Sequence, residues 1–243
     1  MRHRLLFLIS MLLITTATKA EGDDDDNERR FAVQIGLSPS IPIINHEQTS
    51  ALGGKARTTS GPDFFFNAEY FLTETPFAVT GGFIQEKINY YSADLSASLS
   101  ELNLGARWYI LPQTFPIQPY LGASTYWNLS ARKNAGTITM ITNGTTVYKR
   151  DYNIKSPLIS IAPIAGIDIY IFSCMALEID YGFRMAIDGN AKCTTTFRKD
   201  KQYYTMTSSM HRHAFSVGLK FTFPFRFTST DGESLINSLF NSL

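Results

Sequence analysis

The sequence predicts an all-β fold: an eight-stranded antiparallel up-and-down transmembrane β-barrel with short periplasmic turns, long extracellular loops and a short C-terminal helix. Three observations lead to this prediction, namely an export signal, segments in which apolar and polar residues alternate, and connections that are alternately short and long. Strict alternation with a period of two is the pattern of a β-strand whose two faces differ chemically.

The first 20 residues have the features of a secretory signal peptide. Arg2 and Arg4 precede an apolar run, and Ala20 ends a stretch that suits cleavage. The apolar run is shorter than the roughly 20 residues that a membrane-spanning helix needs. Its removal makes the formal net charge of +1 slightly negative, so bulk charge indicates no class of partner. Residues 21–30 then form an acidic leader that we expect to be disordered.

The barrel is predicted to occupy residues 31–227, and its first four strands are expected at residues 31–43, 64–72, 77–90 and 101–110. In the fourth, Leu102, Leu104 and Trp108 fall in one phase. Glu101 and Arg107 fall in the other phase. Such a strand separates an apolar face from a polar face.

The remaining four strands are expected at residues 117–131, 158–172, 175–188 and 213–227. The last has the strongest pattern, because alternate positions from Phe215 to Phe227 are all apolar and five of them are phenylalanine. Between the fifth and sixth strands, Asn143-Gly144 is a strong hairpin signal, and its arms could continue these two strands beyond the membrane. Residues 189–210 read as a polar connection that contains two strand-prone pieces, Thr194 to Phe197 and Tyr203 to Thr207.

Two further patterns favour an apolar exterior over an apolar interior. The connections after strands two, four and six are short and the others are mostly long, which is the parity of outer-membrane barrels. The polar phase is largely Gly, Ala, Ser, Thr and Asn, and small residues suit the crowded interior of an eight-stranded barrel. A secreted lipocalin-like binder, with its apolar face inside, is the main alternative.

Residues 31–227 resemble the small eight-stranded outer-membrane barrels of the OmpA/OmpX type and the outer-membrane β-barrel domains of Bacteroidetes-type bacteria. In the last strand, Ser216, Gly218, Phe221 and Phe223 are similar to the terminal signal that the barrel-assembly machinery recognises. The resemblance implies a location in the outer membrane of a Gram-negative cell. It also implies contact with the assembly machinery, with outer-membrane lipid and with lipopolysaccharide.

The predicted interior carries charges of both signs, which we expect to form an internal network of ion pairs. An unpaired buried ion is costly, whereas a paired one roughly breaks even, so a narrow lumen should be closed by its own charges. The expected members are Glu69, Glu101, Arg107, Asp168, Glu178, Asp180, Arg184, Lys220 and Arg226.

Catalytic, metal and cofactor sites are not expected. Ser209, His211 and His213 share one phase at the outer end of the last strand, where a lipid-modifying enzyme would act, but no acid lies in the same phase nearby. No His/Cys cluster has the spacing of metal ligands. Cys174 and Cys193 fall at opposite ends of one long strand, so we expect no disulfide between them.

Two of the long connections are basic and are the best candidates for surface binding. Contact with the anionic head groups of lipopolysaccharide is one interpretation. The other is a protruding basic sheet that binds an extracellular protein or glycan partner. A protein partner would bind by adding a strand to the edge of the sheet. The basic residues concerned are Arg132, Lys133, Lys149, Arg150 and Lys155 in one connection, and Lys192, Arg198, Lys199, Lys201 and Arg212 in the other.

Residues 228–243 are expected to form a periplasmic amphipathic helix. Thr230 and Glu233 make a capping box, and an apolar stripe at helical spacing follows. For the whole chain, the sequence favours an integral barrel with a structural or adhesive role. A small-solute porin and an outer-membrane lipid-modifying enzyme remain as alternatives.

Overall fold

The computed structural model describes residues 29–49, 58–60, 63–90, 95–113, 115–142, 145–197 and 203–224. These residues form strands β1 to β13 in chain order. Their bounds are β1 Phe31–Leu37, β2 Ser40–Thr49, β3 Thr58–Ser60, β4 Phe64–Phe71, β5 Phe77–Tyr90, β6 Leu95–Tyr109, β7 Ile117–Asn128, β8 Lys133–Thr142, β9 Thr145–Lys155, β10 Ile159–Phe172, β11 Met175–Ile187, β12 Asn190–Phe197 and β13 Tyr203–Phe223.

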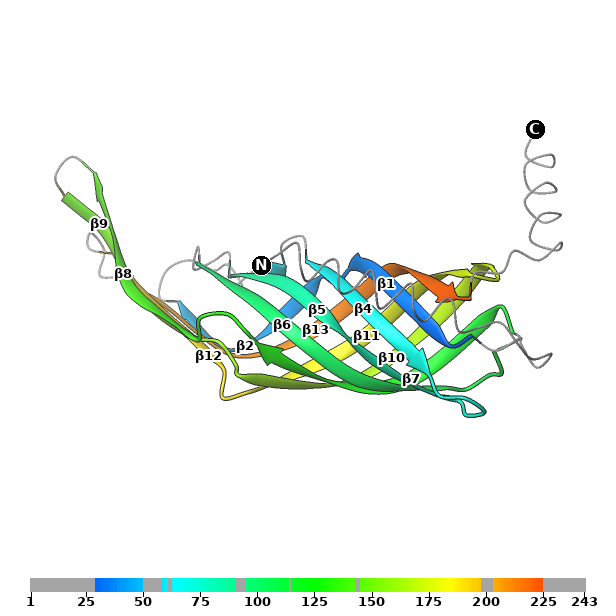
Figure 1. Cartoon of the computed structure of the whole chain (residues 1–243). Coiled ribbons are helices and arrows are strands. Elements are labelled where there is room, and N and C mark those ends of the chain that lie inside the picture. Colours follow the sequence, from blue (N-terminus) through cyan, green and yellow to red (C-terminus); the bar gives the residue numbers. More distant parts are fainter. Residues whose placement is uncertain are drawn as a thin grey trace, which may run out of the picture.

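Eight strands close into one antiparallel barrel, which confirms the predicted fold class. Neighbouring strands follow the order β1, β4, β5, β6, β7, β10, β11 and β13, and β13 pairs again with β1. In Figure 1 the barrel lies across the view, with the tight turns at one end. Within the described part of the chain, no helix is long and apolar enough to cross a membrane.

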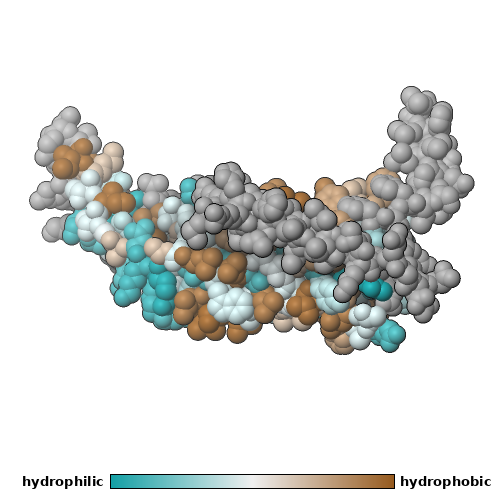
Figure 2. Space-filling model, in the orientation of Figure 1, coloured by the Kyte–Doolittle hydropathy of each residue, from teal (hydrophilic) through white to brown (hydrophobic). Residues whose placement is uncertain are grey.

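The two faces of the barrel wall have the predicted polarity. Ile35, Leu104 and Val217 are examples of large apolar side chains that lie exposed on the outside. Apolar residues cover much of the visible barrel wall in Figure 2, and hydrophilic residues gather toward one end. The inward phase is polar and buried, as in Gln34 and Ser160. An apolar exterior around a polar interior is the arrangement of a transmembrane barrel.

The barrel closes along a seam where two glycines face each other, Gly36 on β1 and Gly218 on β13. A Cβ atom on Gly36 would come within 2.3 Å of the carbonyl oxygen of Val217 and 2.8 Å of the ring of Phe65. The ring of Phe65 therefore lies over the bare backbone of the seam. Glycine is needed here because the first and last strands approach closely beneath a buried aromatic ring.

Beyond the barrel, five strand segments continue as a protruding sheet, in the order β8, β9, β12, the first half of β13 and β2. We call this the protruding sheet (Figure 1). Several predicted boundaries were wrong for this reason. The segment read as a polar connection at residues 189–210 is β12 and the start of β13, and the last strand begins at Tyr203.

The first predicted strand was wrong in a similar way, because it divides at Pro39 into β1 and β2. β1 pairs with β4 on one side and β13 on the other, while β2 pairs with the N-terminal half of β13. The signal peptide, most of the acidic leader and the C-terminal helix fall on residues outside the described ranges. They stay predictions.

Candidate functional site: a filled lumen and a protruding sheet

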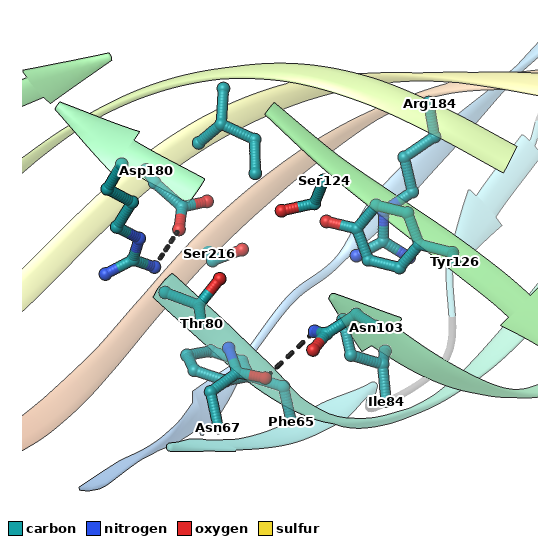
Figure 3. Close-up of a pocket in the computed structure, with 12 residues that line it drawn as sticks. Phe65, Asn67, Thr80, Ile84, Asn103, Ser124, Tyr126, Asp180, Arg184 and Ser216 are labelled. Carbon is teal, nitrogen blue, oxygen red and sulfur yellow. Dashed lines mark hydrogen bonds and ion pairs between the residues drawn. The ribbon is translucent and has the colours of Figure 1, made fainter. Parts of the chain in front are cut away.

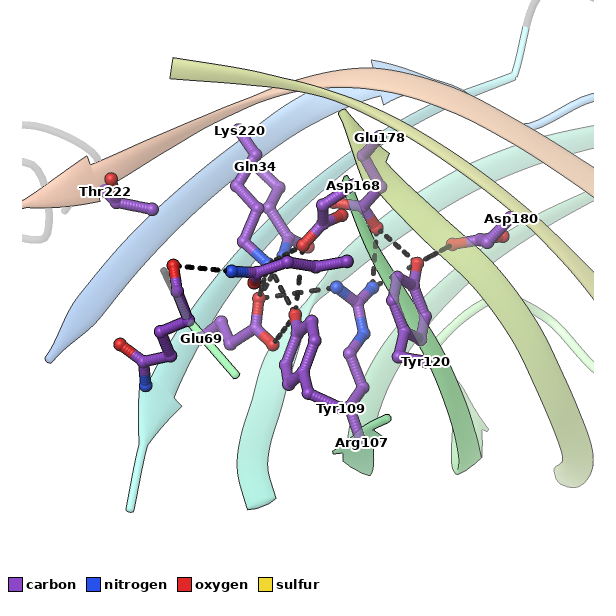
Figure 4. Close-up of polar contacts among 12 residues, drawn as sticks. Gln34, Glu69, Arg107, Tyr109, Tyr120, Asp168, Glu178, Asp180, Lys220 and Thr222 are labelled. Carbon is purple, nitrogen blue, oxygen red and sulfur yellow. Dashed lines mark hydrogen bonds and ion pairs between the residues drawn. The ribbon is translucent and has the colours of Figure 1, made fainter. Parts of the chain in front are cut away.

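Six inward-facing ionisable residues meet inside the barrel near the short turns (Figure 4). We call them the turn-side cluster: Glu69, Arg107, Asp168, Glu178, Asp180 and Lys220. They reach the lumen from β4, β6, β10, β11 and β13, because each occupies the inward phase of its strand.

Two cations hold the turn-side cluster together. The ammonium of Lys220 lies 2.5 Å from Glu69 and 2.6 Å from Asp168. The guanidinium of Arg107 lies 2.6 Å from Glu178 and 3.3 Å from Glu69. These pairs are shielded from water, so breaking one would leave an uncompensated buried charge.

Two tyrosines complete the hydrogen bonding of the turn-side cluster. The hydroxyl of Tyr109 lies 2.7 Å from Glu69 and accepts a hydrogen bond from Lys220 at 2.6 Å. The hydroxyl of Tyr120 lies 3.2 Å from Glu178, and the guanidinium of Arg107 stacks 4.4 Å from the centre of its ring. Polar side chains thus fill the width of the lumen at this level.

A second group of charges lies nearer the protruding sheet, and we call it the sheet-side cluster: Glu86, Glu101, Arg184 and Arg212. Arg212 lies 2.9 Å from both Glu86 and Glu101. Arg184 lies 2.9 Å from Glu86 and 3.4 Å from Glu101. The four side chains form a closed square of ion pairs, and all are buried.

A small cavity of about 20 Å³ separates the two clusters (Figure 3). Asn67, Thr80 and Ser124 line it together with Arg107 and Arg184 from the two clusters. A volume of this size holds about one water molecule. It offers no room for an organic solute.

An apolar core closes the lumen above the sheet-side cluster, where the barrel passes into the protruding sheet. Its buried members include Ile88, Leu99, Ile154, Met206 and Met210. The lumen is therefore filled in layers of charge, a small polar cavity, charge again and apolar side chains.

The predicted lumen network matches these positions closely but misses two members. Of the predicted residues, only Arg226 lies outside the described ranges. Glu86, on an inward-facing position of β5, joins the network through both arginines of the sheet-side cluster. Arg212 was placed in a basic loop, which was wrong, since it is fully buried in β13. The signal that could have found Arg212 is the alternation of Tyr204, Met206, Ser208 and Met210, which extends the inward phase of the last strand backward.

The protruding sheet presents a free edge and a basic outer face. Within the described chain, β8 pairs with β9 alone, so its other edge is open. Along β8, Ile138, Met140 and Ile141 are 39%, 48% and 62% exposed. Lys133 is the only charged residue of β8. A long edge strand with a single charge, rich in β-branched residues, is ready to pair with another chain.

Not every basic residue assigned to surface binding lies on the surface. Lys149 and Lys192 are exposed, but Arg150 is buried on the inner face, where its Nε donates to Thr195 at 3.2 Å. The surface assignment of Arg150 was therefore wrong. Arg198, Lys199 and Lys201 lie outside the described residues.

Asp188 ties the junctions of the protruding sheet together. It receives hydrogen bonds from Lys155, at the end of β9, and from Arg132, just before β8, the latter at 3.0 Å. These hydrogen bonds, first that from Lys155 and then that from Arg132, lower the pKa of the Asp188 carboxyl. Asp188 also has a positive φ of 59°, so the bend between β11 and β12 and the two ion pairs meet at one residue.

The residues considered for catalysis do not form a nucleophile and base pair. His213 Nδ1 lies 2.8 Å from the hydroxyl of Tyr181, and His211 Nδ1 accepts a hydrogen bond from the backbone N–H of Ala186 at 3.0 Å. The hydroxyl of Ser209 has no hydrogen-bond partner in the described chain. Each imidazole is thus engaged by groups that play no part in acyl transfer.

Neither the two cysteines nor the possible metal ligands form a reactive site in the described part of the chain. Cys174 lies beside a short turn and Cys193 in the protruding sheet; both are buried, and no disulfide joins them. Burial raises the pKa of the Cys193 thiol, which makes it a poor nucleophile. No group of three or more His, Cys, Asp or Glu side chains that could hold a metal ion occurs among the described residues.

Comparison with solved structures finds barrels of similar outline. The N-terminal β-barrel domain of OprF from Pseudomonas aeruginosa is 11% identical, with 81% of this chain and 100% of that chain covered and a TM-score of 0.41. The outer membrane protein AlkL is 14% identical over 83% and 93% of the two chains, with a TM-score of 0.46. Ail of Yersinia pestis, an attachment invasion locus protein, is 14% identical over 80% and 99%, with a TM-score of 0.35. No protein-family model and no curated protein matches the sequence.

Proposed function

We propose that the protein is an integral outer-membrane barrel that acts as a closed anchor for a surface-binding sheet. The observation that carries this proposal is the contrast between a lumen filled by its own side chains and a sheet that ends in an open edge. Binding at the cell surface then occurs on the sheet, by addition of an extended strand of a partner protein to β8.

The filled lumen supports an anchor over a porin. The two charge clusters and the apolar core lie one above another, and the cavity between the clusters measures about 20 Å³. A solute path would require several buried ion pairs to open at once. Each broken pair leaves buried charges unpaired, at a cost of about 3–5 kcal/mol.

The charge of the protruding sheet supports an acidic partner strand. Strands β8, β9 and β12 carry Lys133, Lys149, Lys155 and Lys192 on exposed or half-exposed positions, with Asp151 as their only acidic residue. The positive electrostatic field of these lysines speeds the encounter with a negatively charged partner. This attraction weakens as salt is added. An acidic residue in the added strand would meet Lys133 directly.

The test is adhesion of cells that display the protein to an immobilised extracellular-matrix preparation. One variant lacks residues 135–153 and so loses the β8 edge. A matched variant, Lys133→Gln/Lys149→Gln/Lys192→Gln, keeps the edge and loses its charge. We expect the first variant to lose adhesion and the second to retain it with slower, less salt-sensitive attachment.

Contact with lipopolysaccharide is the second function that these residues suit. Arg132, Lys133, Lys155 and Lys192 lie at or near the base of the sheet, where anionic head groups would meet the protein. In that case the charge-neutral variant, and not the hairpin deletion, would change binding to vesicles that contain lipopolysaccharide. Unchanged adhesion in the hairpin deletion, with normal display at the surface, would refute strand addition.

A further inference from the structure

Three fully buried oxygen-bearing side chains form one row across the wall of the barrel near the short turns. Asp168 on β10 pairs in register with Gln118 on β7 and with Glu178 on β11. All three side chains point inward and none is exposed. Directly opposed residues on antiparallel strands have Cβ atoms about 4.5–5.5 Å apart, so the three polar groups are immediate neighbours.

Each member of this row has one oxygen that faces no donor. Asp168 uses Oδ2 for Lys220, and Glu178 uses Oε1 for Arg107. Gln118 donates from Nε2 to the backbone carbonyl of Gln113 at 2.8 Å. The remaining oxygens, Asp168 Oδ1, Glu178 Oε2 and Gln118 Oε1, have no hydrogen-bond donor within the described chain. Three buried acceptors on neighbouring strands are therefore left without a donor in the described chain.

Among the described residues, the charges around the row do not balance. Glu69, Asp168, Glu178 and Asp180 face Arg107 and Lys220. The other groups nearby are phenols and amides, namely Tyr109, Tyr120, Tyr170 and Gln34, which carry no formal charge at neutral pH. Arg29 lies at the rim, where its guanidinium stacks 3.5 Å from the centre of the Tyr170 ring. Even with Arg29 counted, the carboxyl groups in the described part of the chain outnumber the cations there by four to three.

We propose that this row is a proton-binding site, in which Asp168 and Glu178 share a proton while the protein is at neutral pH. Two neighbouring carboxyl groups in a fully buried site cannot both ionise without strong repulsion. A proton on either one removes a charge and provides the missing donor to the row. A metal ion is a poorer fit, because no described group of acidic, His or Cys side chains is arranged to hold one. This inference is independent of the proposed surface binding.

The direct test is the infrared spectrum of the refolded full chain in lipid bilayers, in which a protonated carboxyl group gives its own carbonyl band. We expect this band in the wild-type protein at neutral pH and its loss in Asp168→Asn/Glu178→Gln. Asp188→Asn, which changes an exposed carboxylate, is the control and should leave the band unchanged. Because the double variant leaves two carboxylates for two cations, its heat-unfolding midpoint should equal or exceed that of the wild type.

Other outcomes would overturn the proposal. A wild-type protein without the band has no protonated carboxyl group, and a midpoint that then rises with sodium concentration would assign the site to an alkali ion. A band that persists in the double variant would place the proton elsewhere. A band that is absent from the wild type, together with a midpoint insensitive to sodium, would mean that ordered water supplies the donors. Glu69→Gln should lower the midpoint in every case, since Lys220, Arg107 and Tyr109 all contact that carboxylate.

Discussion

The sheet-side cluster pairs two guanidinium groups with two carboxylates, whereas the turn-side cluster sets four carboxylates against one guanidinium and one ammonium. The first is complete in itself, because each arginine reaches both glutamates with its planar fork. The second depends on two tyrosine hydroxyls and, in our proposal, on a proton. The two parts of one lumen thus differ in how fully their carboxylates are paired with cations.

The two clusters also differ in the groups that surround them. The sheet-side cluster lies beneath the apolar core, which separates it from solvent on that side. The turn-side cluster lies toward the short turns, next to backbone carbonyls and phenols that can accept or donate hydrogen bonds. Removing a charge should therefore be costly in the sheet-side cluster and tolerated at some positions of the turn-side cluster.

The largest effect is expected from Arg212→Ala in the sheet-side cluster. It would leave Glu86 and Glu101 sharing Arg184, with one buried carboxylate unpaired. We expect the free energy of unfolding, measured by urea titration in lipid vesicles, to fall by about 3–5 kcal/mol. Arg132→Ala removes an arginine from an exposed ion pair and should change the free energy of unfolding by less than about 1 kcal/mol. If Arg212→Ala and Arg132→Ala lowered the free energy of unfolding equally, the ion pairs of the sheet-side cluster would not stabilise the barrel as described.

A somewhat smaller effect is expected from Gly218→Val at the seam between the two clusters. A Cβ atom there would lie 2.7 Å from the carbonyl oxygen of Ile35 and 2.8 Å from the Phe65 ring. Overpacking of this kind costs about 1–3 kcal/mol. Phe65→Leu combined with Gly218→Val should recover part of the loss, since the shorter side chain vacates the space. No recovery would mean that the backbone contact alone limits the seam.

Glu178→Gln in the turn-side cluster should have a smaller effect still. The amide has the shape of a protonated carboxyl group and keeps an oxygen for Arg107, so we expect a change in unfolding free energy within about 1 kcal/mol. Glu101→Gln is the matched change in the balanced cluster and should cost about 3–5 kcal/mol. If both variants cost the same, the two clusters do not differ in the way described.

The smallest effect is expected at Asp188, outside both clusters. Its folded-state pKa is lowered by hydrogen bonds, chiefly from Lys155. Its contribution to stability is therefore complete above the ordinary aspartate pKa of about 3.9 and is lost as the pH falls through the folded-state value. Asp188→Asn should speed protease cleavage at the base of the protruding sheet at neutral pH and leave barrel unfolding unchanged.

A matched variant separates charge from backbone geometry at this position. Asparagine tolerates the positive φ of Asp188, whereas alanine does not. Asp188→Ala should therefore be cleaved faster than Asp188→Asn. Identical rates would show that the ion pairs alone hold the junction.

The sequence predicted the barrel well because period-two alternation fixes which face of each strand is inside. From Glu69 to Lys220, each described residue of the predicted network lies in the lumen. What alternation cannot predict is which inward charges meet, because partners such as Arg212 and Glu101 are far apart in the chain and come together only when the barrel closes. The balance of each cluster was therefore not visible in the sequence.

The protruding sheet was harder to predict for a different reason. Its strands alternate apolar and polar residues less strictly, since both faces of β8 are exposed. Asn143-Gly144 correctly indicated a hairpin between β8 and β9. No hairpin signal marks β12, where threonine occupies both faces, and only its second half, Thr194 to Phe197, was recognised as strand-prone. Arg150 was misassigned because a basic residue in a presumed loop is expected to face solvent.

The most direct test of a lumen closed by its own charges is the conductance of the refolded full chain in a planar lipid bilayer. The two ion-pair clusters, the cavity of about 20 Å³ between them and the apolar core predict no steady conductance above that of the lipid. Large, steady single-channel steps from the wild-type protein would contradict the account, because ions could then cross a lumen that these side chains fill.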